Sequence, residues 1–205
     1  PIQNLLAAIA IGFGIGINAL VALHLGAGER EKAEAAATHG MALSLLHGVV
    51  GTVVCLFVLP WFLGRFTSDA NTLSMGITYA RIVFAFSTIN MAGLAFEKIF
   101  QALGRMKLTM AALITGCVGN ILLDPLLIFG IGPFPKMGIA GAALATGIGQ
   151  TLSLAVYLAV YCTTELPLRF RRRWLHFQAA LEARLYAIGV PAILNLALPS
   201  LLVTF

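Results

Sequence analysis

Six long apolar runs dominate this chain, and each is close to the length that crosses a bilayer as a single helix. They span residues 2–25, 41–63, 76–103, 108–131, 137–162 and 185–205. A membrane helix needs roughly 20 mostly apolar residues. Backbone polar groups inside hydrocarbon must be satisfied within their own segment, so unbroken runs of this length form helices. The sequence therefore predicts an all-α fold, a polytopic transmembrane helical bundle.

Composition excludes a soluble domain of this size. Hydrophobic residues make up 60% of the chain and charged residues 10%, whereas a soluble domain carries about 25% charged residues. The first run is not a signal peptide, because it lacks a basic start and is too long for an h-region. The chain opens on Pro1 without a methionine and stops at Phe205 inside an apolar run. We therefore expect it to be a fragment of a longer membrane protein.

Basic residues predict the orientation in the membrane. If successive loops alternate sides, ten of the thirteen lysines and arginines fall on one side: Arg30, Lys32, Lys98, Arg105, Lys107, Arg169, Arg171, Arg172, Arg173 and Arg184. Cytoplasmic loops carry the excess of Lys and Arg in membrane proteins. The pattern predicts that loops 26–32, 104–107 and 163–184 are cytoplasmic.

The connection at 163–184 differs from the other loops in length and composition. Basic residues alternate there with apolar ones such as Leu168 and Trp174, a pattern typical of a segment lying along the membrane interface. The basic run 169–174 suits anionic headgroups, and we expect no nucleic-acid partner. The connection divides the chain into an amino-terminal lobe of five transmembrane helices at 1–162 and the start of a carboxy-terminal lobe at 185–205.

Small residues predict where helices approach closely. Gly12 and Gly16 are four apart, and Gly141, Ala145 and Gly149 repeat that spacing. Such stripes let two membrane helices come into close contact. A nucleotide-binding loop is excluded, because its glycines require a preceding strand, and these lie inside an apolar run.

Asp124 and Pro125 interrupt the run 108–131. Asn120 lies four residues before Asp124, which puts both on one helix face, and Pro125 frees the Ile121 carbonyl from the helical ladder and can kink the helix. A carboxylate, an amide and a carbonyl are ligands suited to a small cation. An ionised Asp near the bilayer centre costs about 2.5–3.5 kcal/mol and marks an ion or proton path. We predict a Na⁺ or H⁺ site here, with bonding to a neighbouring helix as the alternative role of Asp124.

Other polar residues are weaker candidates. Thr146 and Gln150 are spaced by four in the next run, where hydrogen bonding between helices competes with a ligand role. The same alternatives hold for Asn90, which is a candidate, with Gln150, for a substrate cavity. Glu97 and Lys98 are adjacent, so they are not expected to form a facing ion pair.

No metal or catalytic pattern is present in the sequence. The histidines and cysteines lack metal-ligand spacing, and no nucleophile is paired with a base. We expect no enzyme activity, no cofactor and no metal beyond Na⁺ at Asp124.

Four motifs together resemble one family, the bacterial multidrug and toxic compound extrusion (MATE) transporters. They lie at residues 12–33, 101–107, 120–130 and 138–150. The resemblance implies twelve helices in two six-helix lobes, with a central cleft and alternating access. On this basis the chain holds the second to sixth helices of one lobe, the connection, and the first helix of the second lobe.

The resemblance also implies functional residues and partners. Asn120 and Asp124 match the fifth-helix pair of the cation site, and Thr146 matches a sixth-helix hydroxyl. The acid that the family carries on its first helix lies outside this sequence. The implied activity is Na⁺- or H⁺-coupled export of amphipathic or cationic compounds across a bacterial inner membrane, by a protein that is monomeric at full length. Alternatives are a lipid-linked saccharide flippase, which would have a cavity rich in Arg and Lys, and a non-transporting membrane scaffold.

Overall fold

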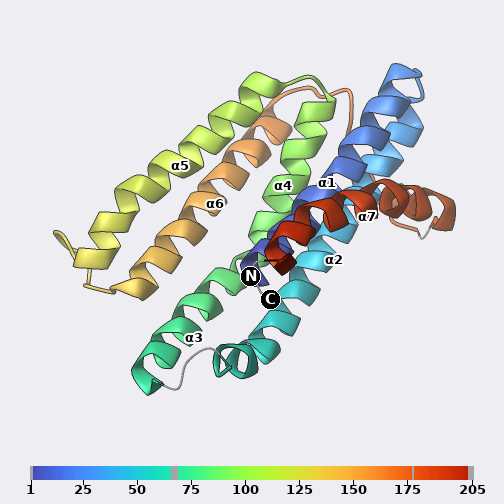
Figure 1. Cartoon of the computed structure of the whole chain (residues 1–205). Helices are drawn as coiled ribbons and strands as arrows, with labels where there is room; N and C mark the ends of the chain where they lie inside the picture. Colours follow the sequence, from blue (N-terminus) through green and yellow to red (C-terminus); the bar gives the residue numbers. More distant parts are fainter. Residues whose placement is uncertain (1, 66–68, 177, 203–205) are drawn as a thin grey trace.

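The computed structural model describes residues 2–65, 69–176 and 178–202. Within these residues the chain is all-α and contains no strand, as predicted (Figure 1). Its elements are α1 (Ile2–Gly26), α2 (Arg30–Leu63), α3 (Ala70–Ala85), α4 (Ser87–Ala102), α5 (Met106–Phe129), α6 (Ile139–Thr163), the short 3₁₀ helix η1 (Arg172–Trp174) and α7 (Ala179–Leu202). The end of the last predicted run, 203–205, lies outside the described residues.

Five of these helices are individually long and apolar enough to cross a membrane. The prediction of one continuous helix at 76–103 is wrong, because α3 and α4 meet at Phe86 with a bend of 43°. Phe86 donates its N–H to the Val83 carbonyl at 3.2 Å, a tighter turn than the α-helical one. The Phe86 ring packs so closely on Gly147 of α6 that a Cβ there would collide with it. Taken as one bent span, α3 and α4 bring the candidate spans to six.

Among the helices that begin before their apolar runs are α2 and α7. α2 begins at Arg30, well before the run at 41–63, and its 34 residues correspond to a length of about 51 Å. The hydrocarbon core is roughly 30 Å thick, so α2 is long enough to project beyond it. α7 likewise begins at Ala179 rather than 185. Charged residues at these helix starts are good helix formers that a search for apolar runs passes over.

The small-residue prediction is confirmed. A Cβ on Gly12 would lie 2.6 Å from the backbone nitrogen of Ile193, and one on Gly16 would lie 2.7 Å from the Leu185 carbonyl oxygen, so α7 crosses directly over α1 (Figure 1). Gly141 faces the Leu127 carbonyl in the α5–α6 pair. Backbone contact of this kind lets dispersion hold membrane helices together.

α7 also contacts α2 through two polar pairs. His47 Nε2 lies 2.9 Å from the Tyr186 hydroxyl, and His39 Nδ1 lies 3.4 Å from Glu182 Oε1. The first helix after the connection therefore packs on the helices that precede it.

The connection between α6 and α7 enters the core, which corrects part of the interface prediction. Leu166 and Leu168 are only 6% and 3% exposed. The Phe170 ring stacks on Tyr161 with ring centroids 5.0 Å apart, and its N–H donates to the Tyr161 hydroxyl at 2.8 Å. Leu175 remains exposed, as expected for an interfacial residue. Aromatic side chains from α4 and α6 form an apolar pocket, and the first half of the connection is buried in it.

The loops separate to the two ends of the bundle. The α1–α2 turn, the α4–α5 turn and the end of α6 lie together, toward the top of Figure 1, and the α2–α3 and α5–α6 connections lie at the other end. The loops predicted to be cytoplasmic therefore share one end. Asp124 lies near the end of α5, in the opposite half.

Candidate functional site

Asp124 lies half-buried on α5. Within the described part of the chain, no hydrogen bond or ion pair joins its carboxylate to another residue, so the alternative of a bond to a neighbouring helix has no partner there. A carboxylate at membrane depth that lacks a protein partner is costly unless it meets water or a cation. The unpaired carboxylate of Asp124 therefore suits the predicted ion site, which stays a prediction.

Asn120 lies one turn before Asp124 on α5 and faces α6. Its Cβ would be 3.1 Å from a Cβ placed on Gly149, so the absence of a side chain at Gly149 makes room for the amide. The Asn120 Nδ2 atom is buried and has no hydrogen-bond partner among the described residues. An amide carries a donor on one side and an acceptor on the other, so rotation of this group would present its oxygen instead.

Thr146 lies on α6 at the level of Asp124. Gly149 faces Asn120 and Gly141 faces Leu127, and Thr146 falls between these two contacts along the antiparallel pair. Its hydroxyl donates to the Ala142 carbonyl at 3.0 Å, which leaves the lone pairs of the oxygen available as acceptors. The register of α5 against α6 thus puts Thr146 at a height near that of Asp124, and their joint role at an ion stays a prediction.

Pro125 lies inside α5, which continues without a break to Phe129. Pro125 has no N–H to donate to the Ile121 carbonyl. Both Pro125 and Ile121 have exposed side chains, so this pair occupies the outer face of α5, next to the face that carries Asn120 and Asp124. The hinge role of Pro125 stays a prediction.

Asn90 and Gln150 line the same two cavities. One, of about 70 Å³, is also lined by Gln3 and Ser87. The other, of about 100 Å³, is also lined by Glu97. Asn90 and Gln150 are both predicted for a substrate cavity, and the packing of α4 against α6 places them on the walls of the same cavities. Their role toward a substrate stays a prediction.

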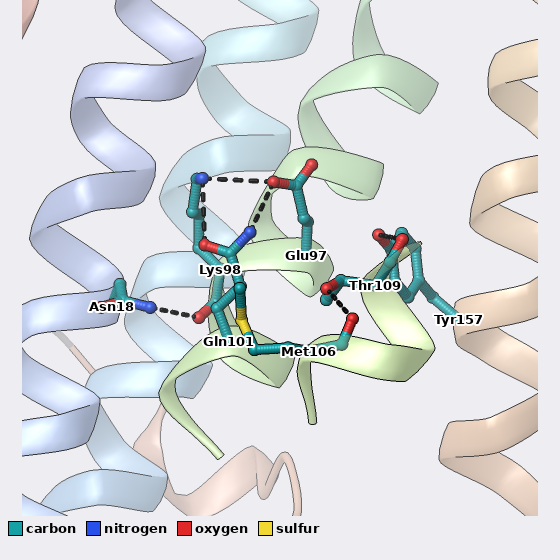
Figure 2. A network of polar contacts seen from close by, with 7 residues as sticks. All are labelled: Asn18, Glu97, Lys98, Gln101, Met106, Thr109 and Tyr157. Carbon is teal, nitrogen blue, oxygen red and sulfur yellow. Dashed lines mark hydrogen bonds and ion pairs between the residues drawn. The ribbon is translucent and has the colours of Figure 1, made fainter. Parts of the chain in front are cut away.

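Glu97 and Lys98 form an ion pair, so the prediction that they would not is wrong. Lys98 Nζ lies 3.2 Å from Glu97 Oε1, and both groups bond Gln101, whose Nε2 donates to Glu97 Oε1 at 2.8 Å and whose Oε1 accepts from Lys98 at 3.1 Å (Figure 2). Adjacent Cβ atoms diverge on a helix, but these long side chains curve back toward a shared partner one turn away. The four-residue spacing of Glu97 and Gln101 is the signal in the sequence that predicts this contact.

This network also connects two helices. Asn18 on α1 donates to the Lys98 carbonyl at 3.0 Å (Figure 2). The Glu97 and Lys98 side chains are only 11% and 16% exposed. The charged pair is therefore a largely buried structural feature between α1 and α4, and Glu97 also lines one of the two cavities of Asn90 and Gln150.

No group of three or more His, Cys, Asp or Glu residues suited to a metal ion occurs in the residues described here. The three cysteines are free thiols. A monovalent cation or a proton at Asp124 stays a prediction.

Comparison with known proteins decides the family. A family model described as MatE matches residues 1–126, more than half of the chain. The chain belongs to the MATE family. The family consists of membrane transporters rather than enzymes, in keeping with the candidate membrane spans of this chain.

Relatives of the chain extend the match to nearly its full length. It is 32% identical to the "Probable multidrug resistance protein YoeA" of Bacillus subtilis, over 98% of the chain and 44% of that protein. It is 25% identical to the "Multidrug export protein MepA" of Staphylococcus haemolyticus, over 97% of the chain and 43% of that protein. The chain therefore spans less than half the length of these curated relatives.

A solved structure shares the fold. A multidrug resistance MATE family transporter of the MOP superfamily, in an inward-facing conformation, superposes with a TM-score of 0.89 over 96% of this chain and 44% of that one, at 24% identity. The helix arrangement described above, including α7 across α1, is therefore a MATE arrangement.

Proposed function

We propose that this chain is part of a cation-coupled antiporter that exports amphipathic or cationic compounds from bacteria by alternating access. The single observation that carries the proposal is the match of 98% of the chain to a relative named as a multidrug resistance protein. The chain supplies an unpaired membrane carboxylate at Asp124 and two small cavities lined in part by polar side chains, and it belongs to a family of transporters. The Asp124 site and the two cavities best suit export through a complete transporter.

Asp124 is the residue that we propose exchanges the coupling ion, Na⁺ or H⁺. Its half-buried carboxylate has no protein partner among the described residues, and the buried amide of Asn120 lies one turn away without a partner. Thr146 adds a hydroxyl oxygen from α6. Ion binding would neutralise Asp124 and relieve the cost of its burial. Loss of the ion would favour a different packing of α5, with the weakened ladder at Pro125 as the place where the helix bends.

The lobe division and orientation complete this proposal. Residues 1–162 would form the amino-terminal lobe without its first helix, 163–184 the cytoplasmic connection, and 185–205 the start of the carboxy-terminal lobe. In a bacterial inner membrane, the excess of basic residues at the α1–α2, α4–α5 and α6–α7 connections would face the cytoplasm. Asp124 would then take its ion from the outside.

The test is Asp124→Asn in the full-length transporter, reconstituted in proteoliposomes with Na⁺ and H⁺ gradients imposed separately. The variant keeps the size of the side chain and removes its charge, so gradient-driven dye efflux should be abolished while insertion and folding are retained. Asp69→Asn is the matched control, because Asp69 is exposed and caps α3. Coupled efflux at the wild-type rate in Asp124→Asn would refute the proposed site.

Two other functions are less well supported. A lipid-linked saccharide flippase needs Arg and Lys in its cavity for a pyrophosphate, yet neither residue lines the two cavities at Asn90 and Gln150 among the described residues. A membrane scaffold needs no cavity with polar side chains, whereas Asn90 and Gln150 line two cavities in this bundle. The same efflux assay separates both from an exporter.

A further inference from the structure

A pocket of about 370 Å³ lies away from the Asp124 site, at the end of the bundle that carries the basic loops. It is formed by the end of α1, the start of α2, η1 and the start of α7. Its charged and polar lining includes His24, Glu31, Lys32, Trp174 and Arg184. Pockets of roughly 300–1,000 Å³ bind small ligands. The proposed export mechanism gives this pocket no role.

The indole nitrogen of Trp174 is an unused donor. It is buried and has no hydrogen-bond partner among the residues described. The neighbouring Arg173 guanidinium lies over the indole ring, 4.7 Å from its centroid, which holds the ring in place. Buried polar groups without partners are uncommon in folded proteins and call for a ligand, a water or an ion.

Among the residues that the structure describes, the charges lining the pocket leave one cation without an ion pair. Glu31 is paired with Arg173 at 2.8 Å, and Lys32 is paired with Glu29 at 2.6 Å. His24 also contacts Glu29, at 2.7 Å. Arg184 makes no ion pair within the described part of the chain. The pocket thus has a net positive lining, with Arg184 and the remaining protons of Lys32 available.

Two arginines of the basic run 169–174 are paired with acidic residues of α2 and do not line the pocket. The sequence predicts that this run binds headgroups, but Arg171 pairs with the buried Glu34 at 3.0 Å, and Arg173 pairs with Glu31. These two arginines hold the connection against α2. Of the unpaired donors among the described residues, Trp174 ends the run and Arg184 lies on α7, and both line the pocket.

We propose that this pocket binds a phosphate group, which Arg184, Lys32 and the Trp174 N–H contact as donors. The guanidinium fork matches phosphate oxygens, and Lys adds a point charge. Ala35, Ala180 and Leu181 provide an apolar wall for the carbon atoms attached to the phosphate. The ends of α1, α2 and α7 lie where anionic phospholipids meet a cytoplasmic surface. A phospholipid headgroup and a soluble phosphate share this chemistry, and the test separates them.

The test measures binding to the purified full-length protein by calorimetry. One arm uses dihexanoyl phosphatidylglycerol, a second uses inorganic phosphate, and dihexanoylglycerol is the control without a phosphate. The variants are Arg184→Gln, which removes the free charge, and Trp174→Phe, which keeps the ring and removes the N–H. Arg65→Gln and Trp61→Phe are matched controls, because Arg65 lies over the Trp61 ring at 4.8 Å at the opposite end of α2.

We expect phosphatidylglycerol to bind and dihexanoylglycerol not to bind. Arg184→Gln should weaken the lipid about tenfold, equivalent to about 1.4 kcal/mol, and Trp174→Phe should weaken it several-fold, with no change in either control. If inorganic phosphate alone binds, with the same loss in both variants, the phosphate site stands and its ligand is soluble. Equal affinities in the pocket variants and the controls would overturn the proposal, and so would equal binding of the lipid without a phosphate.

Discussion

The contact between α5 and α6 depends on the absence of a side chain at Gly141, and Gly141→Ala tests this directly. A Cβ at this position would lie 2.5 Å from the Leu127 carbonyl oxygen and 2.6 Å from its carbon. Both are backbone atoms, so no rotamer change relieves the contact. The same carbonyl accepts the Met137 N–H at 3.0 Å, and this bond closes the α5–α6 connection next to the candidate ion site.

The expected cost follows from this geometry. Carbon atoms pack best at about 3.5–4.0 Å, so the helices must separate by about 1 Å. Overpacking of this kind costs roughly 1–3 kcal/mol, against a gain of at most about 1 kcal/mol from the better helix propensity of Ala. Gly93→Ala is the matched control, because Gly93 also lies inside a helix and a Cβ there meets nothing within 4 Å. Gly93→Ala therefore keeps the gain in helix propensity without the cost of overpacking.

Thermal unfolding of both variants in detergent measures the difference. For domains of this size each kcal/mol shifts Tm by about 2–4 °C, so Gly141→Ala should unfold several degrees below Gly93→Ala. Ion-coupled efflux should also fall in Gly141→Ala, because α6 carries Thr146. If the two variants unfold at the same temperature, α5 and α6 are not in backbone contact at Gly141 and the argument from small residues fails.

Two further predictions concern charged groups. Glu97→Gln leaves the largely buried Lys98 ammonium without its anion, so this variant should destabilise the protein by about 3 kcal/mol. The double variant Glu97→Gln, Lys98→Met should recover most of that stability in the same unfolding assay. Equal stability of the single and double variants would contradict a charge pair. Asp69 caps α3, and hydrogen bonds from the Thr72 side chain and backbone lower its pKa below the ordinary 3.8. The Asp69 carboxylate therefore stabilises α3 above pH 3.8, and this stabilisation is lost as the pH falls below that value. Asp69→Asn should remove this part of the pH dependence of α3 stability. An unchanged pH profile of stability would exclude the Asp69 cap as the source of that dependence.

The candidate ion site was largely predictable, because its residues are close in sequence. Asn120, Asp124 and Pro125 share one helix, so the helical period alone places the first two on a common face. Thr146 required the register of α5 against α6, which depends on the facing glycines. The joint cavity of Asn90 and Gln150 could not be derived from the sequence, since nothing in the period of either helix indicates that α4 packs on α6.

The sequence by itself determined which segments are helices in a membrane, because hydrocarbon admits no other way to satisfy the backbone along long apolar runs. The position of its basic residues at one end follows from the order of those runs. The tertiary structure alone decided the bend at Phe86, the burial of Leu166 and Leu168, and the shared cavities of Asn90 and Gln150. Each depends on side chains that reach across helices or turns, and a one-dimensional pattern of hydropathy contains no information about that reach.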